Sequence, residues 1–153
     1  MKNNKSAKCR IEKTTANINW FGPYLLDRIY YYEIAYEKGF YSISRVWGGK
    51  ESLLYIGKTK RMLIERIFEH DNWIYKTRGK IKVRFGILEL YRGQKFSDKR
   101  LKDMEALLIA YHNPPFNVQN HYYYYGRCPL TIINKGRRGP IEGRVSTDEM
   151  DWV

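Results

Sequence analysis

The sequence predicts an α+β fold in which a small antiparallel sheet of three strands is flanked by helices. Two observations lead to this prediction. First, 43% of the 153 residues are hydrophobic and 16% are aromatic, which suits one packed domain with short extensions. Second, apolar periodicities and turn signals follow the order helix, strand, strand, helix, strand, helix. Helices packed on a small sheet would bury the apolar faces of these elements.

The first expected element is a helix that begins at Pro23, because proline suits the first turn of a helix. Apolar side chains then recur at helical spacing as far as Tyr36. Lys38 and Gly39 would end this helix.

The expected sheet comes from three later segments. Residues 40–47 alternate apolar and polar side chains over most of their length and predict a strand. Residues 48–51 predict a turn and residues 52–57 a second strand, so the two strands should form a hairpin. Residues 83–90 are largely apolar and β-prone and predict the third strand.

Two more helices complete the expected fold. Thr59 can cap a helix that runs to about Tyr75. Ser97 can cap the last helix, which should end at Asn113 because Pro114 and Pro115 cannot continue it.

The chain ends differ in character from the middle. Residues 1–19 are polar and basic and predict a mobile basic arm. Residues 20–121 form the expected domain with its N-terminal helix, and residues 122–153 a basic and aromatic C-terminal extension. The arm lacks the apolar stretch of a secretory signal.

The formal net charge of +12 and the pI of about 9.7 point to a polyanionic partner. Nucleic acid and anionic membranes compete as that partner, but no apolar run is long enough to span a membrane. Cys9 and Cys128 lie far apart without zinc-site spacing, so we expect free thiols in a reducing, cytoplasmic compartment.

Several short segments carry the residue types that phosphodiester hydrolysis needs. In chain order they are Gly39-Phe40-Tyr41, Tyr55-Ile56-Gly57, Arg66 with His70, Glu105 and Asn117. This ordered set resembles the GIY-YIG nuclease family over about residues 39–117, roughly half of the chain. The chain departs from the family pattern at Phe40, in a slightly long hairpin and in the spacing before Arg66.

The resemblance implies separate roles for two tyrosines. Tyr41 would help to deprotonate the attacking water, and Tyr55 would position water or phosphate. Their neighbours Lys58 and Arg66 should lower a phenol pKa, because cations favour the phenolate. Gly39 and Gly57 would support the site by permitting close approach. The competing interpretation is two strand tyrosines that only pack.

Positive charge would come from Arg66, which the resemblance places against the scissile phosphate. His70 lies four residues later, so on a helix it would share the same face and could relay a proton. Lys58 could contact phosphate. A solvated surface, with Arg66 paired to Glu65 or Glu69, is the competing interpretation.

The resemblance further implies that Glu105 is the only protein ligand of one divalent ion, Mg²⁺ or Mn²⁺. Asn117 would anchor the loop after the last helix. An exposed or ion-paired glutamate is the alternative at position 105.

Basic residues outside these motifs are candidates for DNA contact. An alternating set surrounds the third strand and could form a phosphate-tracking edge or a solvated edge strand. A second set lies near the C-terminus and resembles a flexible arm. The candidates are Arg78, Lys80, Lys82, Arg84, Arg137 and Arg138.

Together these features predict a metal-dependent DNA endonuclease of the restriction or phage type, acting alone or as a homodimer that reads a two-fold site. A structure-specific or RNA-directed nuclease and a catalytically inactive nucleic-acid-binding module are the alternatives.

Overall fold

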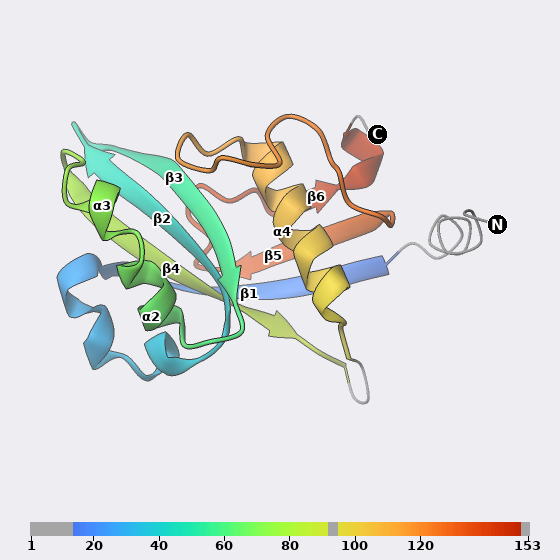
Figure 1. Cartoon of the computed structure of the whole chain (residues 1–153), viewed down its shortest axis with the longest axis horizontal. Coiled ribbons are helices and arrows are strands. Elements are labelled where there is room, and N and C mark those ends of the chain that lie inside the picture. Colours follow the sequence, from blue (N-terminus) through green and yellow to red (C-terminus); the bar gives the residue numbers. More distant parts are fainter. Residues whose placement is uncertain (1–13, 92–94, 151–153) are drawn as a thin grey trace.

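The computed structural model describes residues 14–91 and 95–150, which form a six-stranded mixed sheet with few helices (Figure 1). The strand order is β3-β2-β4-β1-β5-β6. The prediction of a small three-stranded sheet flanked by helices is therefore wrong. The three predicted strands are present, but three further strands extend the sheet on one side.

The expected hairpin and third strand occupy one half of the sheet. Strands β2 (Gly39–Trp47) and β3 (Lys50–Thr59) are antiparallel and join through a tight turn. Strand β4 (Lys80–Glu89) lies antiparallel to β2 on its other side. Strand β3 is consequently at the edge of the sheet, and β4 is internal.

Strand β1 (Thr14–Leu25) lies where the sequence predicted a mobile arm and the start of a helix. It pairs antiparallel with β4 and parallel with β5. Ala16, Ile18 and Trp20 are buried at every second position, which is the period of a strand with one face in the core. Residues 14–19 are thus part of the sheet, with Ala16 and Ile18 in its core, while residues 1–13 lie outside the described residues.

Two 3₁₀ helices, η1 (Leu26–Tyr31) and η2 (Glu33–Tyr36), replace the rest of the expected first helix. Their sequence is rich in tyrosine and isoleucine, which have modest helix propensity. Short 3₁₀ turns follow the surface of the sheet and bury Ile29 and Ala35.

The expected C-terminal extension completes the sheet. Strands β5 (Leu130–Gly136) and β6 (Arg144–Ser146) pair with each other, and η3 (Thr147–Glu149) follows. The Trp20 indole donates a 2.9 Å hydrogen bond to the Asn134 side chain, which fixes β1 to β5.

Helices cover both faces of the sheet (Figure 1). Helix α4 (Asp98–His112) begins at the Ser97 cap as expected and packs on the face that carries Trp20 and Phe40. On the other face, α2 (Leu63–Phe68) and α3 (Asp71–Ile74) replace the single helix expected from about 59 to 75. With η1 and η2 they bury the face that carries Tyr41.

Candidate active site

Two tyrosines lie on the same face of the β2–β3 hairpin. Tyr41 in β2 pairs with Gly57, which lies two residues beyond Tyr55 in β3. Side chains two residues apart share a face of a strand, and the tyrosine rings stack with centroids 5.9 Å apart. Tyr41 is fully buried, whereas Tyr55 is partly exposed.

Two glycines permit close packing around this pair. A Cβ atom at Gly57 would lie 2.4 Å from both Cζ and Oη of Tyr41, which is far inside van der Waals contact. A Cβ atom at Gly39 would lie 2.6 Å from the carbonyl oxygen of Gly86 in β4. Gly57 therefore leaves the space that the Tyr41 phenol fills, and Gly39 lets β2 approach β4.

His70 lies between α2 and α3 and contacts both tyrosines. The Tyr41 hydroxyl and the His70 Nε2 atom are hydrogen-bonded at 2.9 Å. The His70 and Tyr55 rings are in contact, with centroids 4.3 Å apart. His70 is only 8% exposed, so this ring cluster fixes the orientation of the imidazole.

Arg66 in α2 brings positive charge to the ring cluster. Its charge acts on the ionisation of both Tyr41 and His70. The guanidinium also pairs with the Glu69 carboxylate, as the competing surface interpretation suggested. The Arg66 side chain is 35% exposed, so a phosphate can still reach it from solvent.

Burial controls the ionisation of this cluster. It raises the pKa of Tyr41 well above the ordinary value; Tyr55 adds to the rise, and the Arg66 charge opposes it. The expectation that nearby cations lower this pKa is therefore wrong, because desolvation outweighs them. Burial, followed by the Arg66 charge, lowers the pKa of His70 to about 4. The imidazole is thus neutral at pH 7 and can accept a proton.

Glu105 in α4 reaches the same site across the edge of β3. Its carboxylate accepts a hydrogen bond from the Lys58 backbone N–H, and the charges of Lys58 and Arg66 act on it. Burial raises the pKa of Glu105, and these interactions oppose the rise. The charge on Glu105 also acts on Tyr41. The structure therefore gathers the tyrosines, arginine, histidine and glutamate named from the sequence.

Asn117 holds the edge strand β3 beside Glu105. Its side-chain oxygen accepts from the Ile56 N–H at 3.0 Å, and its side-chain nitrogen donates to the Ile56 carbonyl at 2.8 Å. The Phe116 N–H donates to the Leu54 carbonyl at 3.0 Å. The loop after α4 thus pairs with β3 as a neighbouring strand would, which is the anchoring role expected for Asn117.

The donor set fits a single-carboxylate metal site. Among the described residues, no group of three or more His, Cys, Asp and Glu side chains is placed to hold a metal ion. Mg²⁺ often binds through one or two carboxylates, with waters and phosphate oxygens as its other ligands. Glu105 is partly exposed, so its carboxylate can serve as that one protein ligand.

The cations proposed to contact DNA have different surroundings. Arg78 and Lys80 are exposed at the start of β4, and Lys82 is partly exposed. Arg84 is 6% exposed and pairs with Glu51 at 3.0 Å. Because β4 is internal, the expectation of a basic edge strand is wrong. Arg84 instead has a structural partner.

Arg137 and Arg138 lie in the connection between β5 and β6 and are exposed. The Arg137 N–H donates to the Trp20 carbonyl at 2.9 Å, and the Arg138 guanidinium donates to the Ile141 carbonyl at 2.7 Å. The expected flexible arm is therefore a turn held by hydrogen bonds, with both guanidinium groups at the surface.

An aromatic pair that the sequence did not single out as functional borders the ring cluster. Trp73 and Phe116 stack with centroids 4.5 Å apart, and Trp73 contacts His70 with centroids 5.6 Å apart. Trp73 lies three residues after His70, so on a helix the two side chains share nearly the same face. This spacing was the signal in the sequence that could have identified Trp73. Only the fold brings Phe116 next to it.

Two further observations concern the helices and the cysteines. The described residues include no helix that is both long and apolar enough to cross a membrane. Cys128 is buried and disulfide-bonded, so the expectation of free thiols is wrong for this residue. The argument for the cytoplasm that rested on free thiols is thereby removed.

A comparison of the chain with family models, with curated proteins and with solved structures finds no match.

Proposed function

We propose that this protein is a metal-dependent endonuclease that hydrolyses phosphodiester bonds in DNA with a GIY-YIG-type site. One observation carries the proposal: the Tyr41 hydroxyl is hydrogen-bonded to His70, and the charges of Arg66 and Glu105, which come from other elements, act on Tyr41. Hydrolysis of a phosphodiester needs a base for water and positive charge for the phosphate. The gathered side chains supply both.

In this proposal the base is the Tyr41–His70 pair. A buried phenol that keeps its proton at pH 7 cannot deprotonate water by itself. The neutral His70 imidazole accepts the Tyr41 proton through their 2.9 Å hydrogen bond, while the Tyr41 oxygen takes a proton from the attacking water. The low pKa of His70, about 4, keeps this nitrogen unprotonated over the neutral range, and it also makes the imidazole a weak base, so the proton moves only as the water attacks the phosphate.

Positive charge for the phosphate comes from Arg66, whose planar fork suits phosphate oxygens. A phosphate would share or replace Glu69 as the partner of the guanidinium. Glu105 would hold one divalent cation, Mg²⁺ or Mn²⁺, which when bound stabilises negative charge on the phosphate and leaving oxygens. The Lys58 N–H holds the Glu105 carboxylate for that role.

DNA is favoured as the substrate because the net charge is +12 and because Arg78, Lys80, Arg137 and Arg138 are exposed. Such side chains bind phosphates without regard to sequence. Because each protein chain has one site, a cut through both DNA strands requires two protein chains or two successive nicks.

The test is plasmid nicking with Mg²⁺ by the native chain, by Glu105→Gln and by Glu65→Gln, an exposed glutamate on α2 as the matched control. We expect Glu105→Gln to slow nicking by at least about 10² and Glu65→Gln to leave it unchanged. DNA binding in EDTA should be retained by all three proteins.

A panel of duplex, branched and single-stranded DNA and of RNA, each with Mg²⁺ or Mn²⁺, covers the alternative substrates. Cleavage of RNA or of branched DNA alone would replace the proposed substrate. A native chain that binds DNA but cuts no member of the panel is an inactive binding module, and the proposal is then wrong.

A further inference from the structure

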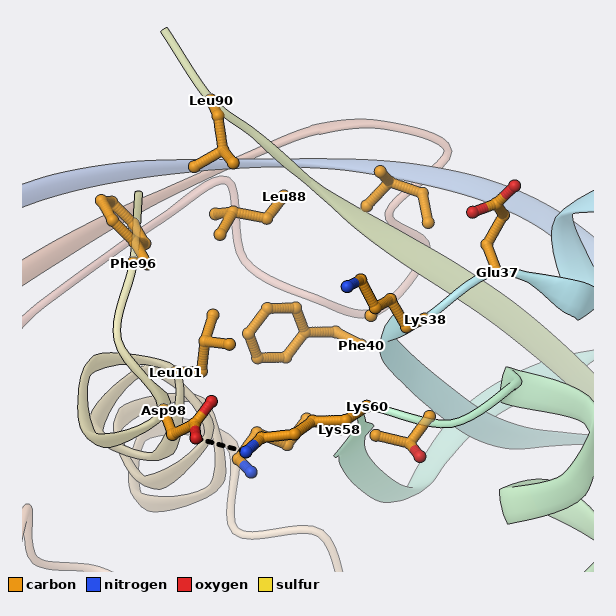
Figure 2. Close-up of a pocket in the computed structure, with 13 residues that line it drawn as sticks. Glu37, Lys38, Phe40, Lys58, Lys60, Leu88, Leu90, Phe96, Asp98 and Leu101 are labelled. Carbon is orange, nitrogen blue, oxygen red and sulfur yellow. Dashed lines mark ion pairs between the residues drawn. The ribbon is translucent and has the colours of Figure 1, made fainter. Parts of the chain in front are cut away.

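A pocket of about 420 Å³ lies beside the candidate active site, on the face of the sheet that α4 covers (Figure 2). Its floor is the ring of Phe40, the middle residue of the first tripeptide. Leu88 from β4, Leu101 from α4 and Phe96 before α4 form apolar walls around this ring. The size and the apolar lining are those of a site for a small flat ligand.

Cationic side chains line the opposite side of the pocket. Lys58 from β3 and Lys60, the residue directly after β3, lie along it, as Figure 2 shows, and Lys38 lies next to Phe40. Lys60 forms an ion pair with Asp98 at the start of α4. A ligand in this pocket would thus meet an apolar wall on one side and ammonium groups on the other.

Two elements connect the pocket to Glu105. In β3, the Lys58 side chain lines the pocket while its backbone N–H binds the Glu105 carboxylate. In α4, Leu101 lies four residues before Glu105 and so on the same face of the helix. A group attached to a phosphate at Glu105 would therefore extend toward the pocket.

We propose that this pocket binds one unstacked nucleobase of the nucleic acid whose phosphate is held at Glu105 and Arg66. A nucleobase has a flat apolar body that stacks on aromatic rings and polar edges that form hydrogen bonds, which matches the partly exposed Phe96 ring on one side and charged side chains on the other. Its flanking phosphates are anions, which suits the three lysines. This inference rests on the proposed function for the position of the phosphate.

An unstacked base has two sources. One source is a base that is already unpaired, in a single strand or a bulge. The other is a base that the protein rotates out of a duplex, which costs unstacking energy. The chemistry in the pocket is the same for both sources, so the experiment has separate arms for them.

The test measures binding in EDTA, where no cleavage interferes, by fluorescence anisotropy. The probes are a short single-stranded DNA and an abasic strand of equal length, which has the same phosphates without bases. The ratio of the two affinities measures how much the bases contribute to binding, because the contribution of the phosphate charges is the same for both probes. Duplexes with and without one bulged nucleotide form the two further arms.

Two pairs of variants accompany the native chain. Phe96→Ala removes an aromatic wall, and Phe68→Ala is its control because Phe68 is exposed on α2, on the other face of the sheet. Leu90→Gln changes an exposed rim residue, and Leu25→Gln is its control at the far end of β1, where it pairs with Lys82.

We expect Phe96→Ala and Leu90→Gln to reduce the affinity ratio, Phe96→Ala on the order of tenfold, while both controls keep the native ratio. If Phe96→Ala also weakens binding of the fully paired duplex, the protein rotates a base out of the duplex. If Phe96→Ala weakens binding only of the single-stranded and bulged probes, the protein captures bases that are already unpaired. The inference is overturned if the affinity ratio of Phe96→Ala equals that of Phe68→Ala and the affinity ratio of Leu90→Gln equals that of Leu25→Gln.

This result is independent of the nicking assay. If the ratio falls in Phe96→Ala but the native chain cuts nothing, the base pocket stands and the nuclease proposal fails. If the chain cuts DNA but the ratio is unaffected, the nuclease proposal stands and the base pocket fails.

Discussion

The substitution Gly57→Ala tests whether packing around Tyr41 builds the site. The added methyl carbon would lie 2.4 Å from Cζ and Oη of Tyr41 and 2.8 Å from Cε1. Carbon atoms in contact are about 3.5–4.0 Å apart, so the phenol must move by roughly 1 Å. Because Tyr41 is fully buried, its ring can move only by disturbing its neighbours or by giving up its hydrogen bond to His70.

The magnitude follows from these distances. Overpacking a buried site costs about 1–3 kcal/mol, and for a chain of this size each kcal/mol lowers the Tm by about 2–4 °C. We therefore expect the Tm of Gly57→Ala to fall by roughly 2–12 °C. A displacement of about 1 Å at a reacting group can slow catalysis by about 10², so nicking should fall much more than DNA binding does.

The assays are thermal unfolding by circular dichroism and plasmid nicking with Mg²⁺. Gly143→Ala is the matched control, because a Cβ atom there meets nothing closer than 3.5 Å, at Arg138, and its stability should stay within about 0.5 kcal/mol of native. If Gly57→Ala matched Gly143→Ala in both Tm and nicking rate, the packing argument for the site would be refuted.

Two further predictions concern stability. Asn117→Ala leaves the N–H and carbonyl of Ile56 without their side-chain partner and should lower the free energy of unfolding, measured in urea, by about 2–4 kcal/mol. Asn117→Asp keeps the hydrogen-bond acceptor and should lose less stability. Equal stability of Asn117→Ala and the native chain would contradict the role of Asn117 as an edge anchor. His70 has a pKa of about 4 in the folded chain and about 6.5 when unfolded, so as the pH falls the unfolded state binds the proton first. Stability should therefore be lost between about pH 6.5 and pH 4, by about 3 kcal/mol, with no further His70 contribution below that window. Urea unfolding of His70→Gln across this range should show a correspondingly smaller loss, and an identical loss in both proteins would show that His70 is not buried as a neutral group.

The part of the fold that local pattern encodes could be predicted from the sequence. Strands β2, β3 and β4 and helix α4 lie close to their expected positions, because alternation, a two-glycine turn and a serine cap are short-range signals. Strand β1 has the same alternation in Ala16, Ile18 and Trp20, but its residues 14–19 follow a basic segment, so the sequence predicts that they belong to the basic arm. Its parallel partner β5 lies more than a hundred residues away, and no local pattern indicates such a pairing.

The candidate site was more predictable than the fold around it. Its residue types and their order pointed to a small set of side chains, of which the structure places Tyr41 and His70 in hydrogen-bond contact; the catalytic roles of these residues stay predictions. The electrostatics could not be predicted in this way. The rise of the Tyr41 pKa depends on complete burial, and the pairing of Arg84 with Glu51 depends on β4 being internal. The helices α2, η1 and η2 and side chains of β4 bury the Tyr41 ring, and β4 is internal because β1, which the sequence did not reveal, pairs with its other edge.

The edge position of β3 explains why the sheet grows on one side only. The outer backbone groups of β3 have partners in α4 and the loop after it: Phe116 binds Leu54, Asn117 binds Ile56, and Glu105 binds Lys58. A further strand at this edge would compete for the same N–H and carbonyl groups and would separate Glu105 from the tyrosines. Additional strands could join without destroying the site only beyond β4, which is where β1, β5 and β6 lie. The same bonds satisfy an edge that would otherwise invite pairing with another chain, so the residues that assemble the site also close the sheet.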